Sequence, residues 1–376
     1  MIEKRIFFPI GQGAFYAEIH ENFSMVYDCG VGHRFNIPLH AQNVIALAAK
    51  HELKGDVILF ISHFDTDHIS GIDFLKTELN NNGKKIAYVI TPLLYDAQKA
   101  ITIALLNKQG FWNTDIIQNP NSFFGESTKI IYVDPTGEAR NNQDPINISR
   151  LATQTISNGT TLTYLNNDWV FIPYNYDYFP RKTYVENMIS GNSINLQQFK
   201  TDPVYALKEI NNNPGLFQSI YNHPINPAKY RYGSYINENS LFLYSGPSSK
   251  MQFLLPIHLP MTHTHNIRNI SIHHHHYYRY FWSGCIYTGD GNLNLVNLAT
   301  TYSKYIPYVG TVQIPHHGSA GNFNISFFQN KSYTCPMSVG SNYKNFPAKS
   351  VLYQLATTNC QTFIANKQNA LVQFFH

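Results

Sequence analysis

The sequence predicts an α/β fold of a size that fits a two-sheet sandwich with outer helices. Its 376 residues are 43% hydrophobic, which suffices for a full core, so we treat 1–376 as a single domain. Short apolar runs with the length of buried strands recur, such as V-I-L-F-I at 57–61 and I-I-Y-V at 130–133. Segments with helical apolar spacing, such as 43–54, alternate with these runs.

Residues 1–6 lack the apolar core and cleavage site of a secretory signal. We therefore expect the start of the chain to lead directly into the first strand. The helix at 43–54 should pack on a sheet face just before the strand at 57–61. A second helix is expected at 96–109. The region 120–165 is rich in Asn, Thr and Ser, which predicts short strands between loops.

The second half of the chain contains two expected helices, at 203–210 and 214–221, separated by three asparagines. Strands follow at 241–243 and 284–287, and V-Q-I at 312–314 forms another short strand. The strands at 284–287 and 312–314 are followed closely by side chains that can bind a metal ion.

The most informative segment is 62–71, which reads S-H-F-D-T-D-H-I-S-G after an apolar strand. Alternation along an extended loop turns His63, Asp65 and Asp67 to one side, and His68 begins the next segment. Imidazole suits zinc, manganese or iron, and carboxylates can bridge two cations. The loop therefore predicts a site for one or two divalent cations, with ligands that stand on a loop outside the core.

Two later strand ends add further candidates. T-G-D at 288–290 places Asp290 at the carboxyl end of a strand, where one carboxylate can bridge two cations. His316 and His317 follow the strand at 312–314. Adjacent side chains there point in opposite directions, so one of the two should reach a given cation. The other binds a second cation, donates a proton to a leaving group, or supports a ligand from behind.

The loop pattern H-x-D-x-D-H resembles the metal loop of the metallo-β-lactamase fold, and Asp65 in the second ligand position is similar to the hydrolase domain of ComEC-type DNA-uptake proteins. Other segments similar to that subgroup follow in family order: P-I-G-Q-G-A at 9–14, V-Y-D-C-G at 26–30, T-G-D at 288–290, P-H-H-G-S at 315–319 and S-V-G-x-N at 338–342. The resemblance implies a four-layered αββα metallo-β-lactamase sandwich.

Two departures and two insertions distinguish the chain from that family pattern. The stretch 169–175 has no histidine where the family carries V-L-H-P, and Phe346 stands where the family carries the imidazole of G-H-P. These departures predict open coordination positions or a single tightly held cation. Insertions are expected at about 174–236 and about 246–280, where they should line the mouth of the site.

The predicted metal ligands are His63, Asp65, Asp67, His68, Asp290, His316 and His317. We expect them to hold one or two Zn²⁺ or Mn²⁺ ions and a water whose pKa falls toward neutrality. Asp67, His68 and His317 are the candidate catalytic residues. Carboxylate-rich ligation makes a hard site that tolerates manganese and suits phosphate oxygens. The leading expectation is a phosphodiesterase or nuclease, with DNA as the substrate that the resemblance implies.

Substrate-binding candidates are fewer, because a net charge of +4 is only mildly basic. Basic and aromatic residues alternate at 229–232 and 277–280, a mixture that can stack on bases while neutralising phosphates. We therefore take Arg231, Arg279 and Ser319 as candidate substrate-binding residues. A histidine run at 273–276 is more typical of a solvated loop than of a metal site.

Cysteine usage predicts a cytoplasmic protein. Cys29, Cys285, Cys335 and Cys360 are widely separated, so neither a zinc ribbon nor a redox pair is indicated. Cys29 and Cys285 lie in expected strands and should be buried. No apolar run approaches the length of a membrane span, and we expect no membrane partner.

Two other functions stay open at this point. A small-molecule hydrolase of a phosphoester or lactone would need a deep, neutral cleft, whereas a nuclease would need a long basic groove. A non-catalytic subunit that binds a partner protein within a multi-protein system is the alternative from a different class. The ligand set alone does not separate DNA from RNA or from a small phosphoester.

Overall fold

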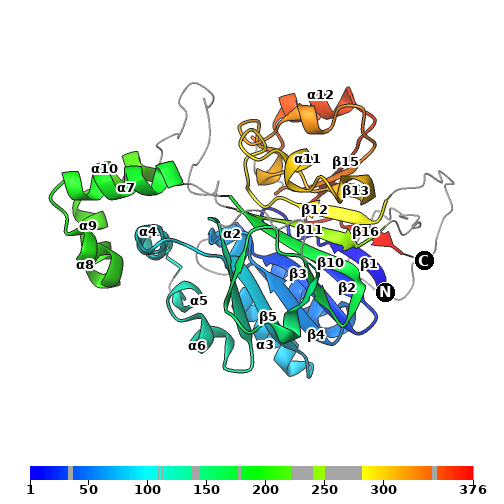
Figure 1. The fold of residues 1–376 in the computed structure, drawn as a ribbon, viewed down its shortest axis with the longest axis horizontal. Helices are drawn as coiled ribbons and strands as arrows, with labels where there is room; N and C mark the ends of the chain where they lie inside the picture. Colours follow the sequence, from blue (N-terminus) through cyan, green and yellow to red (C-terminus); the bar gives the residue numbers. More distant parts are fainter. Residues whose placement is uncertain are drawn as a thin grey trace.

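The protein is a mixed α/β structure built on two eight-stranded sheets, as the computed structural model shows (Figure 1). The described residues are 1–32, 37–108, 110–111, 113–136, 144–176, 179–221, 240–249, 282–340 and 345–375. The coarse fold class predicted from the sequence is therefore confirmed.

The first sheet has the strand order β16-β1-β2-β3-β4-β5-β6-β8. Its strands are β1 (Ile2–Phe7), β2 (Phe15–His20), β3 (Phe23–Cys29), β4 (Asp56–Phe60), β5 (Lys85–Pro92), β6 (Lys129–Asp134), β8 (Thr155–Ser157) and β16 (Leu371–Phe374). From β3 to β8 the neighbours run parallel, so their carboxyl ends meet at one edge. Residues that follow these strands therefore gather along that edge.

The second sheet has the order β15-β14-β13-β12-β11-β10-β9-β7. Its strands are β7 (Ile146–Asn147), β9 (Leu162–Tyr164), β10 (Asn166–Asn175), β11 (Leu241–Pro247), β12 (Gly284–Tyr287), β13 (Val309–Val312), β14 (Thr334–Ser338) and β15 (Gln361–Ala365). Strands β12 to β15 run parallel. One apolar core joins the two sheets, with Tyr27 and Phe60 from the first against Leu243 and Tyr287 from the second.

Helices cover the outer faces of the paired sheets, on opposite sides in Figure 1. Against the first sheet pack α1 (Leu39–Leu47), the π-helix η1 (Ala48–Glu52), α3 (Ile72–Asn81), α5 (Asp115–Gln118) and α6 (Pro120–Phe124). Against the second pack α11 (Leu298–Thr301) and α12 (Lys349–Ala356). Each outer face thus has its own apolar core.

A helical lobe with a separate core projects beside the sheets (Figure 1). It consists of α4 (Asp96–Lys108), α7 (Phe179–Gly191), α8 (Leu196–Thr201), α9 (Pro203–Asn212) and α10 (Pro214–Tyr221). The helices expected at 203–210 and 214–221 are confirmed. The sequence missed α7 and α8, because polar residues interrupt their apolar spacing.

Most other predicted elements are confirmed, including the strands at 57–61, 130–133, 241–243 and 284–287. The strand expected at 312–314 is wrong, because β13 occupies Val309–Val312 and ends where the chain turns toward the histidine pair. The expected insertion at about 246–280 falls largely outside the described residues. In the part of the chain that is described, no helix combines the length and apolar character needed to cross a bilayer.

Candidate metal centre

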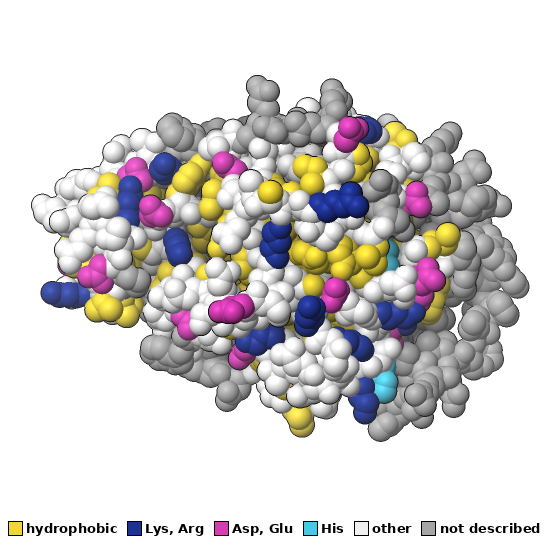
Figure 2. All heavy atoms as spheres, turned by 60° about the horizontal axis from the view of Figure 1, so that its bottom comes forward, with side chains coloured by type: hydrophobic (Ala, Val, Ile, Leu, Met, Phe, Trp, Pro, Cys, Tyr) yellow, Lys and Arg dark blue, Asp and Glu magenta, His cyan; other side chains and the backbone are white. Residues whose placement is uncertain are grey.

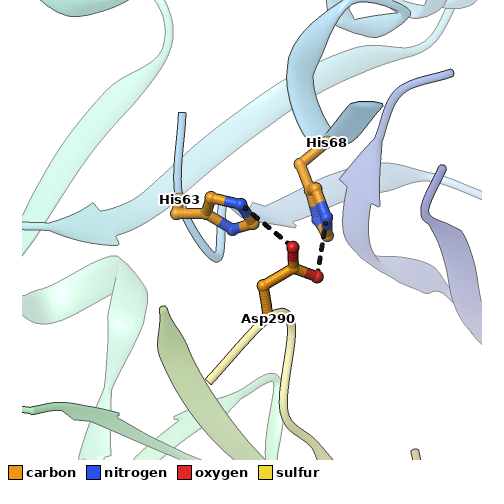
Figure 3. A group of neighbouring side chains, drawn as sticks. All are labelled: His63, His68 and Asp290. Carbon is orange, nitrogen blue, oxygen red and sulfur yellow. Dashed lines mark ion pairs between the residues drawn. The ribbon is translucent and has the colours of Figure 1, made fainter. Parts of the chain in front are cut away.

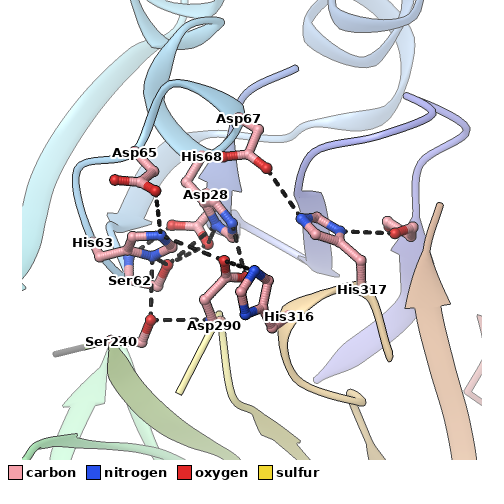
Figure 4. Close-up of polar contacts among 12 residues, drawn as sticks. Asp28, Ser62, His63, Asp65, Asp67, His68, Ser240, Asp290, His316 and His317 are labelled. Atoms are coloured by element: carbon pink, nitrogen blue, oxygen red, sulfur yellow. Dashed lines mark hydrogen bonds and ion pairs between the residues drawn. The ribbon is translucent and has the colours of Figure 1, made fainter. Parts of the chain in front are cut away.

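The carboxyl-terminal edges of the two sheets bring the predicted ligands to one place (Figure 4). His63 lies three residues past β4, and α2 (Thr66–Ile69) carries Asp67 and His68. Asp290 lies three residues past β12 and is almost fully buried, with 2% of its surface exposed. The short 3₁₀ turn His316–Gly318 follows β13. Chain segments more than 200 residues apart in sequence therefore contribute to one cluster.

The glycine motifs near the N-terminus have a direct role in seating α2. A Cβ atom added to Gly30 would lie 2.5 Å from the backbone of Asp67 and His68, and one added to Gly13 would lie 2.9 Å from the Asp67 carbonyl oxygen. The Ala14 N–H donates to that same oxygen at 2.9 Å. Only glycine permits so close an approach of backbones, so these positions fix where α2 begins.

A second set of hydrogen bonds joins the T-G-D segment at 288–290 to the P-H-H-G-S segment at 315–319. The side-chain oxygen of Gln313 accepts hydrogen bonds from the backbone N–H groups of Thr288 and Gly289, at 2.8 and 2.9 Å. The His316 N–H donates to the Gly289 carbonyl at 3.0 Å. These bonds hold the turn that presents Asp290 against the turn that presents the histidine pair.

Asp290 lies between two imidazoles (Figure 3). Its Oδ1 atom is 3.1 Å from His68 Nε2, and its Oδ2 atom is 3.8 Å from His63 Nε2. Metal–ligand bonds of about 2.0–2.2 Å in tetrahedral geometry place two ligand atoms roughly 3–4 Å apart. The spacing therefore suits ligands that share a cation.

The remaining predicted ligands surround this group. His316 Nε2 lies 3.5 Å from Asp290 Oδ2, and His317 Nε2 lies 3.0 Å from Asp67 Oδ2. Asp65 Oδ2 is 4.0 Å from His63 Nε2. All seven predicted ligands are thus brought together. The histidine pair divides between two carboxylates, although it lies in a turn with φ of 49° and 55° and not in a strand, where side chains alternate.

The ring nitrogens away from the cluster are held by partners in the protein. His68 Nδ1 lies 2.8 Å from Asp28 Oδ2, so it donates to that carboxylate. The Ser62 hydroxyl donates to Asp28 at 2.7 Å and lies 2.9 Å from His63 Nδ1. A hydroxyl has one proton, so His63 Nδ1 must be the donor in its contact with Ser62. Both rings therefore carry their proton on Nδ1.

The histidine pair follows the same rule. His317 Nδ1 donates to the Ser338 carbonyl at 2.8 Å, and His316 Nδ1 donates to Asn322 Oδ1 at 3.2 Å. Asn322 also donates from its amide nitrogen to the Asp290 carbonyl at 2.8 Å, which fixes its orientation. All four imidazoles therefore direct their Nε2 atom at a carboxylate oxygen.

That arrangement leaves the cluster incomplete. Within the described part of the chain, His63 Nε2, His68 Nε2 and Asp290 Oδ1 are buried side-chain atoms without a hydrogen-bond partner. A lone pair that faces a carboxylate is repulsive unless a proton or a cation lies between them. The donor set of imidazole nitrogens and carboxylate oxygens fits a divalent metal.

The pKa values reflect the same electrostatics. Burial, together with the neighbouring His68, lowers the pKa of His63 to about 3. Burial would also lower the pKa of His68, but Asp290, Asp28 and Asp67 outweigh it and raise that pKa well above the ordinary value. The field that draws a proton to His68 is the field that would draw a cation.

The pKa values of the acidic residues are also shifted, downward for two of them and upward for the third. Burial favours the neutral form of Asp67, but the charge of His68 and a hydrogen bond with His317 lower its pKa to about 2. Asp290 likewise has its pKa lowered against the effect of burial, chiefly by His316 and His68. Burial raises the pKa of Asp28.

Two sequence expectations about this loop are wrong. Asp67 does not alternate along an extended loop, because the chain turns into α2 directly after Asp65. The ligands also do not all stand outside the core, since His68 is only 1% exposed and bonded to Asp28. Replacing both Asp67 and His68 would therefore disturb a buried network as well as remove ligands.

Several residues of the cluster were missed by the sequence analysis. Asp28 falls inside V-Y-D-C-G, yet a single aspartate at a strand end carries no ligand pattern of its own. Its φ of 57° is unusual for a residue other than glycine, and it marks the turn that aims the carboxylate at His68. Ser62 and Asn322 lie beside ligands in the fold but belong to no spacing rule, and Ser240 fits an N-x-x-S pattern with residue 237 that did not mark it as part of the site. Ser240 Oγ accepts from the Asp290 N–H at 3.0 Å and lies 3.2 Å from His63 Nδ1.

The substrate-binding candidates have mixed outcomes. Ser319 is largely buried in the turn after the histidine pair, where its N–H donates to the His316 carbonyl at 2.9 Å. Arg231, Arg279 and the histidine run at 273–276 lie outside the described residues. On the face drawn in Figure 2, basic and acidic side chains are interspersed and do not gather by sign.

The four cysteines are free, and Cys29 and Cys285 are fully buried as expected. No protein-family model matches the sequence, and no curated protein matches it either. The functional argument therefore depends on the chemistry of the cluster itself.

Proposed function

We propose that this protein is a metal-dependent hydrolase that cleaves phosphodiesters, with DNA as the favoured substrate. The observation that carries the proposal is the set of four imidazole Nε2 atoms directed at the carboxylates of Asp67 and Asp290. A buried group of this kind is stable only with positive charge inside it. Pairing of imidazole with aspartate favours zinc or manganese for that charge.

The proposed fold is the four-layered αββα sandwich of metallo-β-lactamases, related to the ComEC-type hydrolase domain. Two packed sheets with separate helical cores outside them support this assignment. So does the position of the cluster, which lies at the carboxyl ends of strands from both sheets. The motifs quoted for the resemblance all contribute to the cluster or to its support.

The two oxygens of Asp290 face different imidazoles. Two overlapping groups of ligand atoms lie close enough to share a cation: His63, His68 and Asp290, and Asp67, His68 and His317. These residues, with Asp65 beside His63, would hold one or two cations. A bound divalent cation supplies Lewis-acid polarisation of a phosphoryl oxygen and a hydroxide nucleophile at neutral pH.

His316 remains as the proton donor to the leaving group. Its side chain is 14% exposed, against 4% for His317, so it has the better access to substrate. Asn322 holds its Nδ1 proton, and Phe346 stacks on its ring at a centroid distance of 5.7 Å. The ring is therefore fixed with Nε2 facing the cluster, where it can carry the proton that the leaving oxygen needs.

The proposed location is the cytoplasm. Four free cysteines fit a reducing compartment. A partner protein of the same system remains part of the proposal, without a surface assigned to it.

Hydrolysis of bis-p-nitrophenyl phosphate by metal-free protein, after addition of Mn²⁺ or Zn²⁺, tests the function. The matched variants are His317→Ala and His316→Ala. The first should lose metal and activity together. The second should retain metal and lose activity, most strongly on substrates with poor leaving groups. No hydrolysis by the wild type with any divalent metal would exclude the enzymatic proposal.

A further inference from the structure

Two cysteines that are distant in the sequence lie together in the fold. Cys335 is the second residue of β14, and Cys360 directly precedes β15. These strands are parallel neighbours in which Cys335 pairs with Thr362, and the Gln361 N–H donates to the Tyr333 carbonyl at 2.8 Å. Both cysteines pack in the apolar core on the outer face of the second sheet. The strand register therefore creates a cysteine pair that the spacing of the cysteines in the sequence does not reveal.

The two thiols contact each other directly. Cys335 and Cys360 form a side-chain hydrogen bond. Cys335 Sγ also lies 3.8 Å from the Tyr333 carbonyl oxygen, and Cys360 Sγ lies 3.6 Å from the carbonyl oxygen of Lys331. Lys331 and Tyr333 belong to the segment that leads into β14, so the same piece of backbone holds both sulfur atoms.

The members of the pair differ in their access to solvent. Cys360 is half-buried, and its neighbours Asn359 and Gln361 are exposed. Cys335 is fully buried. A small reagent from solution can therefore reach the Cys360 sulfur, with the Cys335 sulfur behind it.

The cysteines also differ in their ionisation. The hydrogen bond from Cys335 lowers the pKa of the Cys360 thiol to about 6, although burial opposes this shift. Burial raises the pKa of Cys335 well above its ordinary value. Burial also raises the pKa values of Cys29 and Cys285. Because the thiolate is the nucleophilic form of cysteine, Cys360 is the reactive thiol of this chain near neutral pH.

We propose that Cys360 is oxidised by hydroperoxides and that Cys335 converts the product to an intramolecular disulfide. The Cys360 thiolate attacks the terminal oxygen of the hydroperoxide, so an S–O bond forms as the O–O bond breaks. The leaving oxygen takes up the proton that Cys360 released and departs as an alcohol or water. The Cys335 sulfur then attacks the Cys360 sulfenic acid, so an S–S bond forms as the S–O bond breaks, and the displaced hydroxide leaves as water with the Cys335 proton. Two electrons pass from the two thiols to the hydroperoxide.

An accessible thiol of low pKa next to a second cysteine is the usual arrangement of redox-sensitive cysteines. Disulfides formed by such pairs in a reducing compartment are transient, so thiol reductants should restore both thiols. None of the candidate metal ligands takes part, so this chemistry is independent of the proposed hydrolysis.

Peroxide treatment of the folded wild-type protein tests the pair. After incubation with hydrogen peroxide in EDTA, which prevents metal-catalysed oxidation, the protein is denatured in an alkylating reagent and its cysteines are mapped by peptide mass. Two of the four cysteines should escape alkylation, and one disulfide should join Cys335 to Cys360, whereas Cys29 and Cys285 should stay reduced as internal controls. Dithiothreitol should restore all the thiols. Retention of every thiol, a bridge between two molecules or a sulfinic acid at Cys360 would overturn the inference.

Two variants separate the roles of the two cysteines. Cys360→Ser should keep all its remaining thiols reduced under the same treatment. Cys335→Ala should form no intramolecular disulfide, and dimedone should trap its Cys360 sulfenic acid. The pH midpoint of Cys360 alkylation by iodoacetamide should lie near 6 in the wild type and higher in Cys335→Ala, because that variant loses the hydrogen-bond donor. Equal midpoints in both proteins, or oxidation of Cys335 in Cys360→Ser, would contradict the assignment. If a variant does not fold, the peptide map of the wild type decides the pairing.

Discussion

Arg5 and Glu18 lie between the two sheets, whereas His68 on α2 and Asp290 lie beyond the carboxyl ends of strands, and all four residues are at most 2% exposed. Glu18 Oε1 accepts from Arg5 Nε at 2.8 Å and from the Tyr287 hydroxyl at 3.1 Å. In the first group a guanidinium balances a carboxylate. In the second, carboxylates face the Nε2 atoms of imidazoles.

Other partners complete the group around Arg5. The second Glu18 oxygen accepts from Ser245 at 2.5 Å and from Trp169 at 3.2 Å, and an Arg5 nitrogen donates to the Ser283 carbonyl at 2.9 Å. The group therefore satisfies its own charges and acts as a structural element. The cluster around Asp290 needs something that the chain does not provide, which is the usual condition of a ligand site.

The largest expected effect comes from breaking the complete group. Arg5→Met leaves the Glu18 carboxylate buried without a counterion, so the free energy of unfolding should fall by about 3–5 kcal/mol. Urea unfolding measures this change. Lys54→Met is the control, because the Lys54–Glu3 pair is 43% and 42% exposed and should contribute only about 0–1 kcal/mol. Similar losses of unfolding free energy in both variants would contradict the claim that Arg5 acts as the buried counterion of Glu18.

A pH series should show the same group in the wild type. Burial opposes ionisation of Glu18, but Arg5 outweighs it and lowers the Glu18 pKa from 4.5 to about 2. The folded-state pKa is below the unfolded value, so the stabilisation is present above pH 4.5 and disappears as the pH falls toward 2. It amounts to about 3 kcal/mol. Glu18→Gln should flatten the unfolding free energy across that window, and an unchanged slope would contradict the assignment.

A smaller effect, on metal affinity, is expected from replacing Asn322, which forms hydrogen bonds with residues of the cluster. Asn322→Ala removes the hydrogen bond that positions the Asp290 backbone, so metal affinity should fall about 10- to 100-fold. Competition with a chromogenic chelator measures it. Asn324→Ala is the control, since Asn324 donates to the Leu293 carbonyl and not to the cluster. The proposal that Asp290 is a metal ligand would lose support if both variants bound metal equally.

The smallest expected difference is between metals. The cluster contains three aspartates among its predicted ligands, so it is harder than an all-histidine site. Metal-free protein reconstituted with Mn²⁺ should hydrolyse a generic phosphodiester at least as fast as protein with Zn²⁺. Activity confined to Zn²⁺ would show that the aspartates do not set the preference.

The sequence predicts the candidate metal ligands better than it predicts the residues that form hydrogen bonds with those ligands. His63, Asp65, Asp67 and His68 follow one strand within six residues, so their chemistry is readable without the fold. Asp290 and the histidine pair are recognisable because strands deliver them. Asp28 and Asn322 act only through residues distant in the chain, and no local pattern records that.

The lobe shows a similar limit for the fold. Helices α9 and α10 begin at prolines, Pro203 and Pro214, and this signal predicts a helix start from sequence alone. Helices α7 and α8 bury Ile189 and Phe199 against α4, which lies far away in the chain. Their apolar faces are defined by that contact and not by a regular spacing.

The central claim is that the cluster around Asp290 is incomplete without a divalent cation. The most direct measurement is the thermal unfolding midpoint of metal-free protein before and after addition of Mn²⁺ or Zn²⁺, for the wild type and Asp290→Asn. Metal should raise the wild-type midpoint, because it binds the folded state, and should leave the variant unchanged. Without metal the variant should be less stable than the wild type, because the imidazoles that lower the Asp290 pKa stabilise its ionised form in the folded protein. A wild-type midpoint that does not respond to either metal would contradict the account.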